Sequence, residues 1–233
     1  MIYDANTHKT SGGSMSHTDS RTPRRGFLGG VAGGAAALLV GRFSNASAEV
    51  LAVAAPPSDA WVAKIKGKYR QVFDNTSPND GWGAAFPLNF IDSTKEATKA
   101  TDADITAVSV FRHFGMPLLL NDAVWAKYHI GEMLKVTDPK TNAPATRNIF
   151  RDNVPLRPGL TYEKIMSSGV IFVACNLALT VISEMAAPNA KVTKDVAKKE
   201  FEAGLLAGSN LAASGVYAVN RAQQSQCTYC YGG

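Results

Sequence analysis

The sequence of 233 residues is poor in the groups from which many enzymes build their active sites. It holds three cysteines and four histidines, and two of those histidines precede residue 48. No G-x-G-x-x-G or G-x-x-x-x-G-K loop follows the first predicted strand, which excludes the common phosphate-binding loops. No G-x-S-x-G motif is present either, which excludes the nucleophile elbow of α/β-hydrolases. We find no internal repeat.

The net charge beyond residue 48 is also small. The whole chain has 24 basic and 19 acidic residues, a net charge of +5. Residues 1–48 hold five of the basic and two of the acidic residues, so the remainder has 19 against 17, or +2. A body so nearly balanced has no electrostatic footprint for nucleic acid, and we expect no nucleic-acid partner.

The first 48 residues have the three parts of an export signal. Arg24-Arg25 opens a basic part, an apolar stretch rich in Gly and Ala covers 27–40, and Ala46-Ser47-Ala48 is an A-x-A cleavage pattern. The pattern predicts a twin-arginine signal that is cleaved, with the mature protein in the periplasm and free of the membrane. The alternative is a retained anchor, although the apolar part is short for a membrane span. Either Met1 or Met15 could be the start.

Beyond the signal, strand and helix patterns alternate. We expect a linker or short helix at 49–65 and a single domain at 66–233. Alternation of this kind predicts an α/β fold with a mostly parallel five-stranded sheet and helices on both faces. The expected strands are 68–73, 104–113, 170–174, 209–212 and 227–231. The expected helices are 84–93, with Pro87 in its first turn, and 118–134, 161–168, 176–186, 193–203 and 214–224.

One segment lacks any periodicity. Residues 136–160 contain four prolines, and we expect a long insertion loop there. Loops of this length are usually functional or mobile.

The predicted strand ends select a candidate site. In parallel sheets the ligand lies outside the carboxyl ends of the strands. Those ends carry candidate catalytic residues, Cys175 and His113, and candidate ligand-binding residues, which are Asp74, Asn75, Arg112 and Ser214.

Cys175 has a local argument as well. It lies between a strand and the start of a helix, where free backbone N–H groups and the helix dipole favour a negative charge. The thiolate is the reactive form of a cysteine. The alternative is an inert core residue within "IFVACNLAL". His113 is predicted as a base or charge partner for Cys175, as a metal ligand, or as a hydrogen-bonded residue at the sheet edge.

The last two cysteines form a C-x-x-C pair. Cys227 and Cys230 could form a disulfide, leaving Cys175 as the free thiol. Residues three apart in a strand point to opposite faces, which disfavours the bond unless a turn intervenes. Three unpaired thiols are the alternative. No second ligand pair suits structural zinc.

Two stretches resemble a known family. "SSGVIFVACNLALT" and "LAASGVYAVNRAQQSQCTYCY" are similar to the DsrE-like family of small α/β proteins. The pieces "RQVFDNTSPNDG" and "FRHFGMPLLLNDAVWAKY" resemble an exported branch of that family. The resemblance implies a flavodoxin-like sheet, a homo-oligomer, and a persulfide carried on the cysteine at the position of Cys175. The chain departs from the family in its export signal, its long loop and its His113.

Two functions therefore follow as expectations. The first is a periplasmic thiol protein that binds or transfers persulfide sulfur through Cys175, with a small sulfur-containing molecule or a protein thiol as its partner. The second is a non-catalytic module that binds a metal or haem through Cys175 and His113. The sequence requires no cofactor, although a thiolate near an imidazole would suit copper or haem iron. The third alternative is a structural protein that has the family fold but does not use Cys175 for chemistry.

Overall fold

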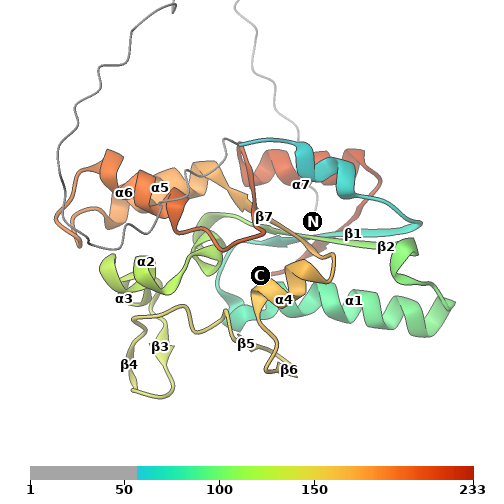
Figure 1. Ribbon diagram of the computed structural model, residues 1–233, viewed down its shortest axis with the longest axis horizontal. Coiled ribbons are helices and arrows are strands. Elements are labelled where there is room, and N and C mark those ends of the chain that lie inside the picture. The colour runs from blue at the N-terminus through green and yellow to red at the C-terminus, as the bar shows by residue number, and fades with distance from the viewer. Residues whose placement is uncertain (1–56) are drawn as a thin grey trace, which may run out of the picture. The chain divides into compact units, whose positions relative to one another are not determined.

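The computed structural model describes residues 57–233 (Figure 1). The predicted export signal and the first part of the predicted linker lie outside these residues. The central element is a parallel sheet with the strand order β8-β7-β2-β1-β9. Its strands are β1 (Tyr69–Asn75), β2 (Ile105–Phe111), β7 (Ile171–Cys175), β8 (Asn210–Ala212) and β9 (Thr228–Tyr231). The predicted five-stranded α/β sheet is thus confirmed, with every pairing parallel.

Helices cover both faces of this sheet. Figure 1 shows α1 (Trp82–Thr98) and α4 (Tyr162–Ser167) on one side and α7 (Gly215–Gln224) on the other. Alternate strand residues feed two separate cores, because side chains of a strand alternate between faces. One core includes Phe73, Phe111 and Phe172. The other joins Val72, Val108 and Val173 to α7 and to a short 3-10 helix, η1 (Ala60–Lys64).

Helix α1 is longer than predicted and holds Pro87 in its interior rather than in its first turn. A proline there lacks the N–H that would bond to the carbonyl four residues earlier. That carbonyl belongs to Gly83, and it accepts a hydrogen bond from the Ser109 hydroxyl of β2 at 2.7 Å. The neighbouring strand therefore supplies the donor that Pro87 lacks, and the helix continues.

The helix predicted at 118–134 is divided into shorter pieces. They are the 3-10 helix η4 (His113–Leu119), α2 (Asp122–Lys127) and α3 (Ile130–Leu134). Asn121 caps α2 by accepting from the Val124 N–H at 3.0 Å. His129 has a φ of +52° between α2 and α3, and the Tyr128 carbonyl accepts a hydrogen bond from the side chain of Asn189 instead of from a following turn. Tertiary contacts thus override helix periodicity here.

The segment 136–160 is a packed insertion. It forms two small hairpins, β3 (Thr137–Asp138) with β4 (Ala143–Pro144) and β5 (Asn153–Val154) with β6 (Arg157–Pro158). Between them, the buried Asn148 side chain donates to the carbonyls of Leu118 and Leu120 at 2.7 and 2.8 Å. These bonds attach the segment to the end of η4 and to Leu120, which follows it.

The last third of the chain agrees best with the sequence. Helices α5 (Asn176–Ala186) and α6 (Lys194–Ala203) start as predicted, and Thr193 caps α6. The remaining short 3-10 helices are η2 (Asn79–Gly81) and η3 (Asp102–Asp104). Within residues 57–233, no helix has both the length and the apolar character needed to cross a membrane.

Candidate functional site

A cavity of about 420 Å³ lies at the carboxyl ends of β7 and β8. Strand β7 leads into α5, whose buried residues join the core of α1, whereas β8 leads into α7 in the opposite core. Neighbouring strands whose connections turn to opposite faces leave a crevice at their carboxyl ends, and ligands of open α/β sheets bind there. The cavity is lined by Arg112, His113, Phe114, Cys175, Leu177, Ala178, Val181, Ile182, Met185, Ser214, Gly215 and Val216.

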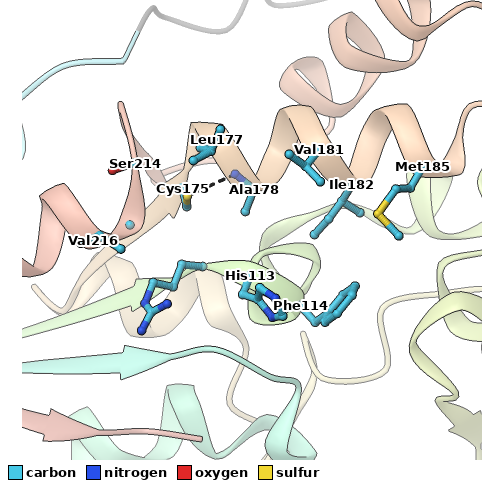
Figure 2. A pocket seen from close by; sticks show the side chains of 12 residues that line it. His113, Phe114, Cys175, Leu177, Ala178, Val181, Ile182, Met185, Ser214 and Val216 are labelled. Atoms are coloured by element: carbon cyan, nitrogen blue, oxygen red, sulfur yellow. Dashed lines mark hydrogen bonds between the residues drawn. The ribbon is translucent and has the colours of Figure 1, made fainter. Parts of the chain in front are cut away.

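Cys175 lies at the junction of β7 and α5. It is the last residue of the strand and the N-cap of the helix. Its Sγ accepts a hydrogen bond from the Ala178 N–H at 3.2 Å, drawn as the dashed line in Figure 2. Its side chain lines the cavity although the residue is only 5% exposed. A free N–H of the first helical turn is therefore directed at this sulfur, as the sequence predicts.

Arg112 supplies a positive charge to the same cavity. Its Nε and terminal amino group donate to the two oxygens of Asp74 at 2.6 and 2.9 Å. Asp74 Oδ2 also accepts from the Tyr229 hydroxyl at 3.0 Å. The hydrogen bond to Asp74 raises the pKa of Arg112 further, although partial burial of the guanidinium opposes the rise. Arg112 and Cys175 thus belong to the lining of one cavity.

The start of α7 closes the cavity on its other side. Ser214 caps this helix by accepting from the Tyr217 N–H at 3.2 Å. The following Gly215 lies against the Arg112 side chain, because a Cβ at that position would lie 2.4 Å from the Arg112 Cβ. The glycine thus gives Arg112 the space to lie between β2 and α7.

His113 lines the cavity from η4 and follows Arg112 directly. Its backbone has a φ of +51°, and its ring packs edge-on against Phe114 with centroids 4.5 Å apart. Figure 2 shows His113 on the wall that faces α5. Among the described residues, no hydrogen bond joins His113 to Cys175. The predicted base role of His113 stays a prediction.

The predicted metal site has two candidate ligands in this cavity, Cys175 and His113. Over residues 57–233, no group of three or more His, Cys, Asp or Glu side chains is arranged to hold a metal ion. A metal or haem bound here would take at most these two side chains from such a set, and the alternative stays a prediction.

The other two predicted ligand-binding residues lie outside the cavity. Asp74 is buried and acts through Arg112. Asn75 is buried as well, and its side chain donates to Ser109 Oγ and to the Val110 carbonyl, which ties β1 to β2. Both residues lie at the carboxyl edge of the sheet, as the strand-end rule predicted. Their side chains, however, bond to neighbouring strand ends and do not line the cavity.

The disulfide considered for Cys227 and Cys230 is absent from the structure, where all three cysteines are free thiols. Cys227 is buried in the core under α7, whereas Cys230 packs against the opposite core. Cys227 directly precedes β9 and Cys230 lies within it, and the two side chains point to opposite faces of the sheet.

Sequence reasoning missed the apolar wall of the cavity. Leu177, Val181 and Met185 of α5 are 59%, 48% and 53% exposed, and Val216 of α7 is 69% exposed. Their spacing in α5 is i, i+4 and i+8, which places them on one helix face. In the sequence this face is indistinguishable from the buried face of the same apolar helix. Tyr229 was missed too, because its link to Asp74 depends on pairing between β9 and β1.

Comparisons with known proteins assign no family or function to this chain. No protein-family model matches the sequence, and no curated protein is significantly similar to it. Among solved structures, the chain is similar to the protein of unknown function MTH1491 from Methanobacterium thermoautotrophicum. The two are 16% identical with a TM-score of 0.37, and the match covers 70% of this chain and 98% of that chain. This distant likeness carries no functional argument, which rests on the geometry of the cavity.

Proposed function

We propose that this chain is a thiol protein that accepts and transfers sulfane sulfur through Cys175. The observation that carries the proposal is the placement of this sulfur in the lining of a cavity, within 3.2 Å of a helix N–H, with Arg112 in the same lining. Both groups stabilise a negatively charged sulfur, which is the form that attacks and the form that leaves in exchange at sulfur.

The proposed step is an exchange without net oxidation. The Cys175 thiolate attacks the outer sulfur of a donor persulfide, R–S–SH. The sulfur–sulfur bond of the donor breaks, a new sulfur–sulfur bond forms on Cys175, and R–S⁻ leaves. An acceptor thiolate then attacks the outer sulfur and releases Cys175 as a thiolate. His113, which lines the same cavity, is the candidate base that takes the proton of the Cys175 thiol before the first step.

The test is intact-protein mass spectrometry after incubation with polysulfide, followed by peptide mapping. We expect the mass of sulfur to appear on Cys175, and none at that site in Cys175→Ser. Cys230→Ser is the matched control, since Cys230 lies outside the cavity, and it should take up sulfur like the parent protein. Sulfur found only on Cys230, with Cys175 unmodified, would refute the proposal. His113→Gln should slow the uptake if the imidazole takes the proton.

We further propose that the protein works in the periplasm after twin-arginine export. The support is the Arg24-Arg25 pair with the apolar stretch and the A-x-A site that follow it. Replacing both arginines with lysine should retain the uncleaved chain in the cytoplasm. If that variant is cleaved and recovered from the periplasm like the parent chain, the proposed twin-arginine export is wrong.

A further inference from the structure

The cavity has two chemically different ends. The polar or reactive residues of its lining are Arg112, His113, Cys175 and Ser214. Its wall consists of the side chains of Phe114, Leu177, Val181, Ile182, Met185 and Val216 (Figure 2). Small-molecule sites in proteins have this composition, with a mostly apolar lining and a few polar groups that fix orientation. Their usual volume of about 300–1,000 Å³ includes the size of this cavity.

The wall remains open to solvent although it is apolar. Leu177, Val181 and Met185 are each about half exposed, whereas Leu179 on the opposite face of α5 is fully buried. Covering such surface is favourable by about 25 cal/mol per Å² of apolar area. A ligand with an apolar body therefore gains affinity from this wall, and an ion without one does not.

The recessed position of Cys175 limits the shape of the donor. Only 5% of the residue is exposed, and the cavity between α5 and α7 is the space from which its sulfur is reached. A donor must therefore present its sulfur at the end of a slim group. A cysteine persulfide on a folded protein surface is attached to a bulky backbone, whereas a small organic persulfide fits the cavity.

We infer that the donor is a small organic persulfide, R–S–SH, with an apolar body R and a terminal sulfur that reaches Cys175. This inference rests on the proposed function and adds the class of substrate. The terminal sulfur faces Cys175 and Arg112, which line the same cavity, and the body covers the α5 wall. Thiosulfate can contact the polar residues of the lining but not the apolar wall, because it is small, doubly charged and without an apolar part. The step is the exchange described above, with an alkyl thiolate as the leaving group.

A series of donors tests the inference directly. Methyl, butyl and hexyl persulfide are compared with thiosulfate, and the rate of sulfur uptake by Cys175 is followed by mass spectrometry. Each methylene covered by the wall should raise the second-order rate constant, by up to about fourfold where its burial is complete. Equal rates for the three alkyl donors, or a faster reaction with thiosulfate than with hexyl persulfide, would overturn the inference while leaving sulfur uptake by Cys175 intact.

A matched pair of variants locates the effect. Val181→Thr changes a wall residue that is 48% exposed, and Val196→Thr changes a residue of α6 that is 40% exposed and outside the cavity. The first should lower the rate with hexyl persulfide several-fold and leave methyl persulfide nearly unchanged. The second should alter neither. Equal effects of both variants would show that the α5 wall does not bind the alkyl body of the donor. Faster transfer from a peptide-borne cysteine persulfide than from hexyl persulfide would contradict the inferred donor class.

Binding without chemistry separates the two proposals. Calorimetry with hexanethiol and methanethiol on Cys175→Ala measures the cavity alone. Tighter binding of hexanethiol supports the ligand class even if the parent protein takes up no sulfur, in which case only the proposed function fails. Equal binding of the two thiols overturns the ligand class. The wall could instead be covered by a second copy of this chain. In that case Val181→Thr changes the sedimentation coefficient and leaves the dependence of the uptake rate on alkyl chain length unchanged. This result also overturns the ligand class.

Discussion

Asp74 holds Arg112 through both carboxylate oxygens, at 2.6 and 2.9 Å, across the ends of β1 and β2. The carboxylate is buried, whereas 29% of the Arg112 side chain is exposed. Such a two-point pair fixes the plane of the guanidinium. Because the strand ends are fixed by the sheet, this pair determines where positive charge lies relative to Cys175. The geometry of the candidate site thus begins at Asp74 on β1, two strands away from the cysteine on β7.

Replacing Arg112 should impair both stability and sulfur uptake. In Arg112→Gln the buried Asp74 loses its counter-charge, and we expect a loss of roughly 3 kcal/mol in unfolding free energy. Uptake by Cys175 should fall about tenfold, as expected for the loss of one stabilising charge worth about 1.4 kcal/mol. Denaturant unfolding and single-turnover mass spectrometry measure the two effects.

Arg112→Lys is the control for this prediction, because it keeps the charge and loses the two-point pairing. It should retain more of the uptake rate than Arg112→Gln. If Arg112→Gln takes up sulfur as fast as the parent protein, the charge beside Cys175 has no part in the reaction.

Tyr229→Phe should have a smaller effect. It removes one hydrogen bond, of 3.0 Å, to Asp74 from a residue that is about half exposed. We expect a loss of about 0.5–1.5 kcal/mol in unfolding free energy, with uptake nearly unchanged because Asp74 still holds Arg112. Tyr231→Phe on the same strand is the control, since its hydroxyl contacts Thr76 instead of Asp74. Equal losses of unfolding free energy in the two variants would show that the hydrogen bond from Tyr229 to Asp74 adds no stability beyond that of the Tyr231 contact.

Cys227 should resist alkylation. Burial raises the pKa of its thiol from 9.0 to about 11, so little thiolate is present at pH 8. Iodoacetamide followed by peptide mapping should modify Cys230 well before Cys227, and both equally after unfolding. Because the folded-state pKa is the higher one, the neutral thiol contributes stability below about pH 9, and this contribution is lost as the pH rises to about 11. Fast native-state alkylation of Cys227 would contradict its burial.

The Ser109 hydroxyl should be coupled to Pro87. Ser109→Ala leaves the buried Gly83 carbonyl without its donor, because Pro87 has no N–H to offer. We expect a loss of about 1–3 kcal/mol in unfolding free energy. In a Pro87→Ala background the new N–H can reach Gly83, so the same serine substitution should cost less. A double-mutant cycle by denaturant unfolding measures this coupling, and a coupling of zero would reject the account of α1.

The sequence predicted the sheet well because its signals are local. The strand predicted at 104–113 forms at Ile105–Phe111 and is buried on both faces, and Thr193 and Ser214 are strong N-caps. It failed where distant segments decide the local structure. The Asn189 contact to Tyr128 and the Ser109 contact to Gly83 join residues far apart in the chain, so helix length at these points could not be read from periodicity.

The candidate site was predicted in part for the same reason. The rule on strand ends brought Arg112, His113, Cys175 and Ser214 to one cavity. It could not separate the residues that face the cavity from Asp74 and Asn75, which face neighbouring strands, since that depends on side-chain direction at the last residue. The apolar wall of α5 was hidden because exposed and buried apolar residues look alike in a sequence.

Cyanolysis tests the central claim most directly. The parent protein and Cys175→Ser are each treated with a small excess of butyl persulfide, desalted and exposed to cyanide, which removes an outer sulfur as thiocyanate and restores the thiolate. The account predicts about one thiocyanate per chain from the parent protein and almost none from Cys175→Ser. Equal thiocyanate from both proteins would contradict it, because the sulfur would then reside on a residue other than Cys175.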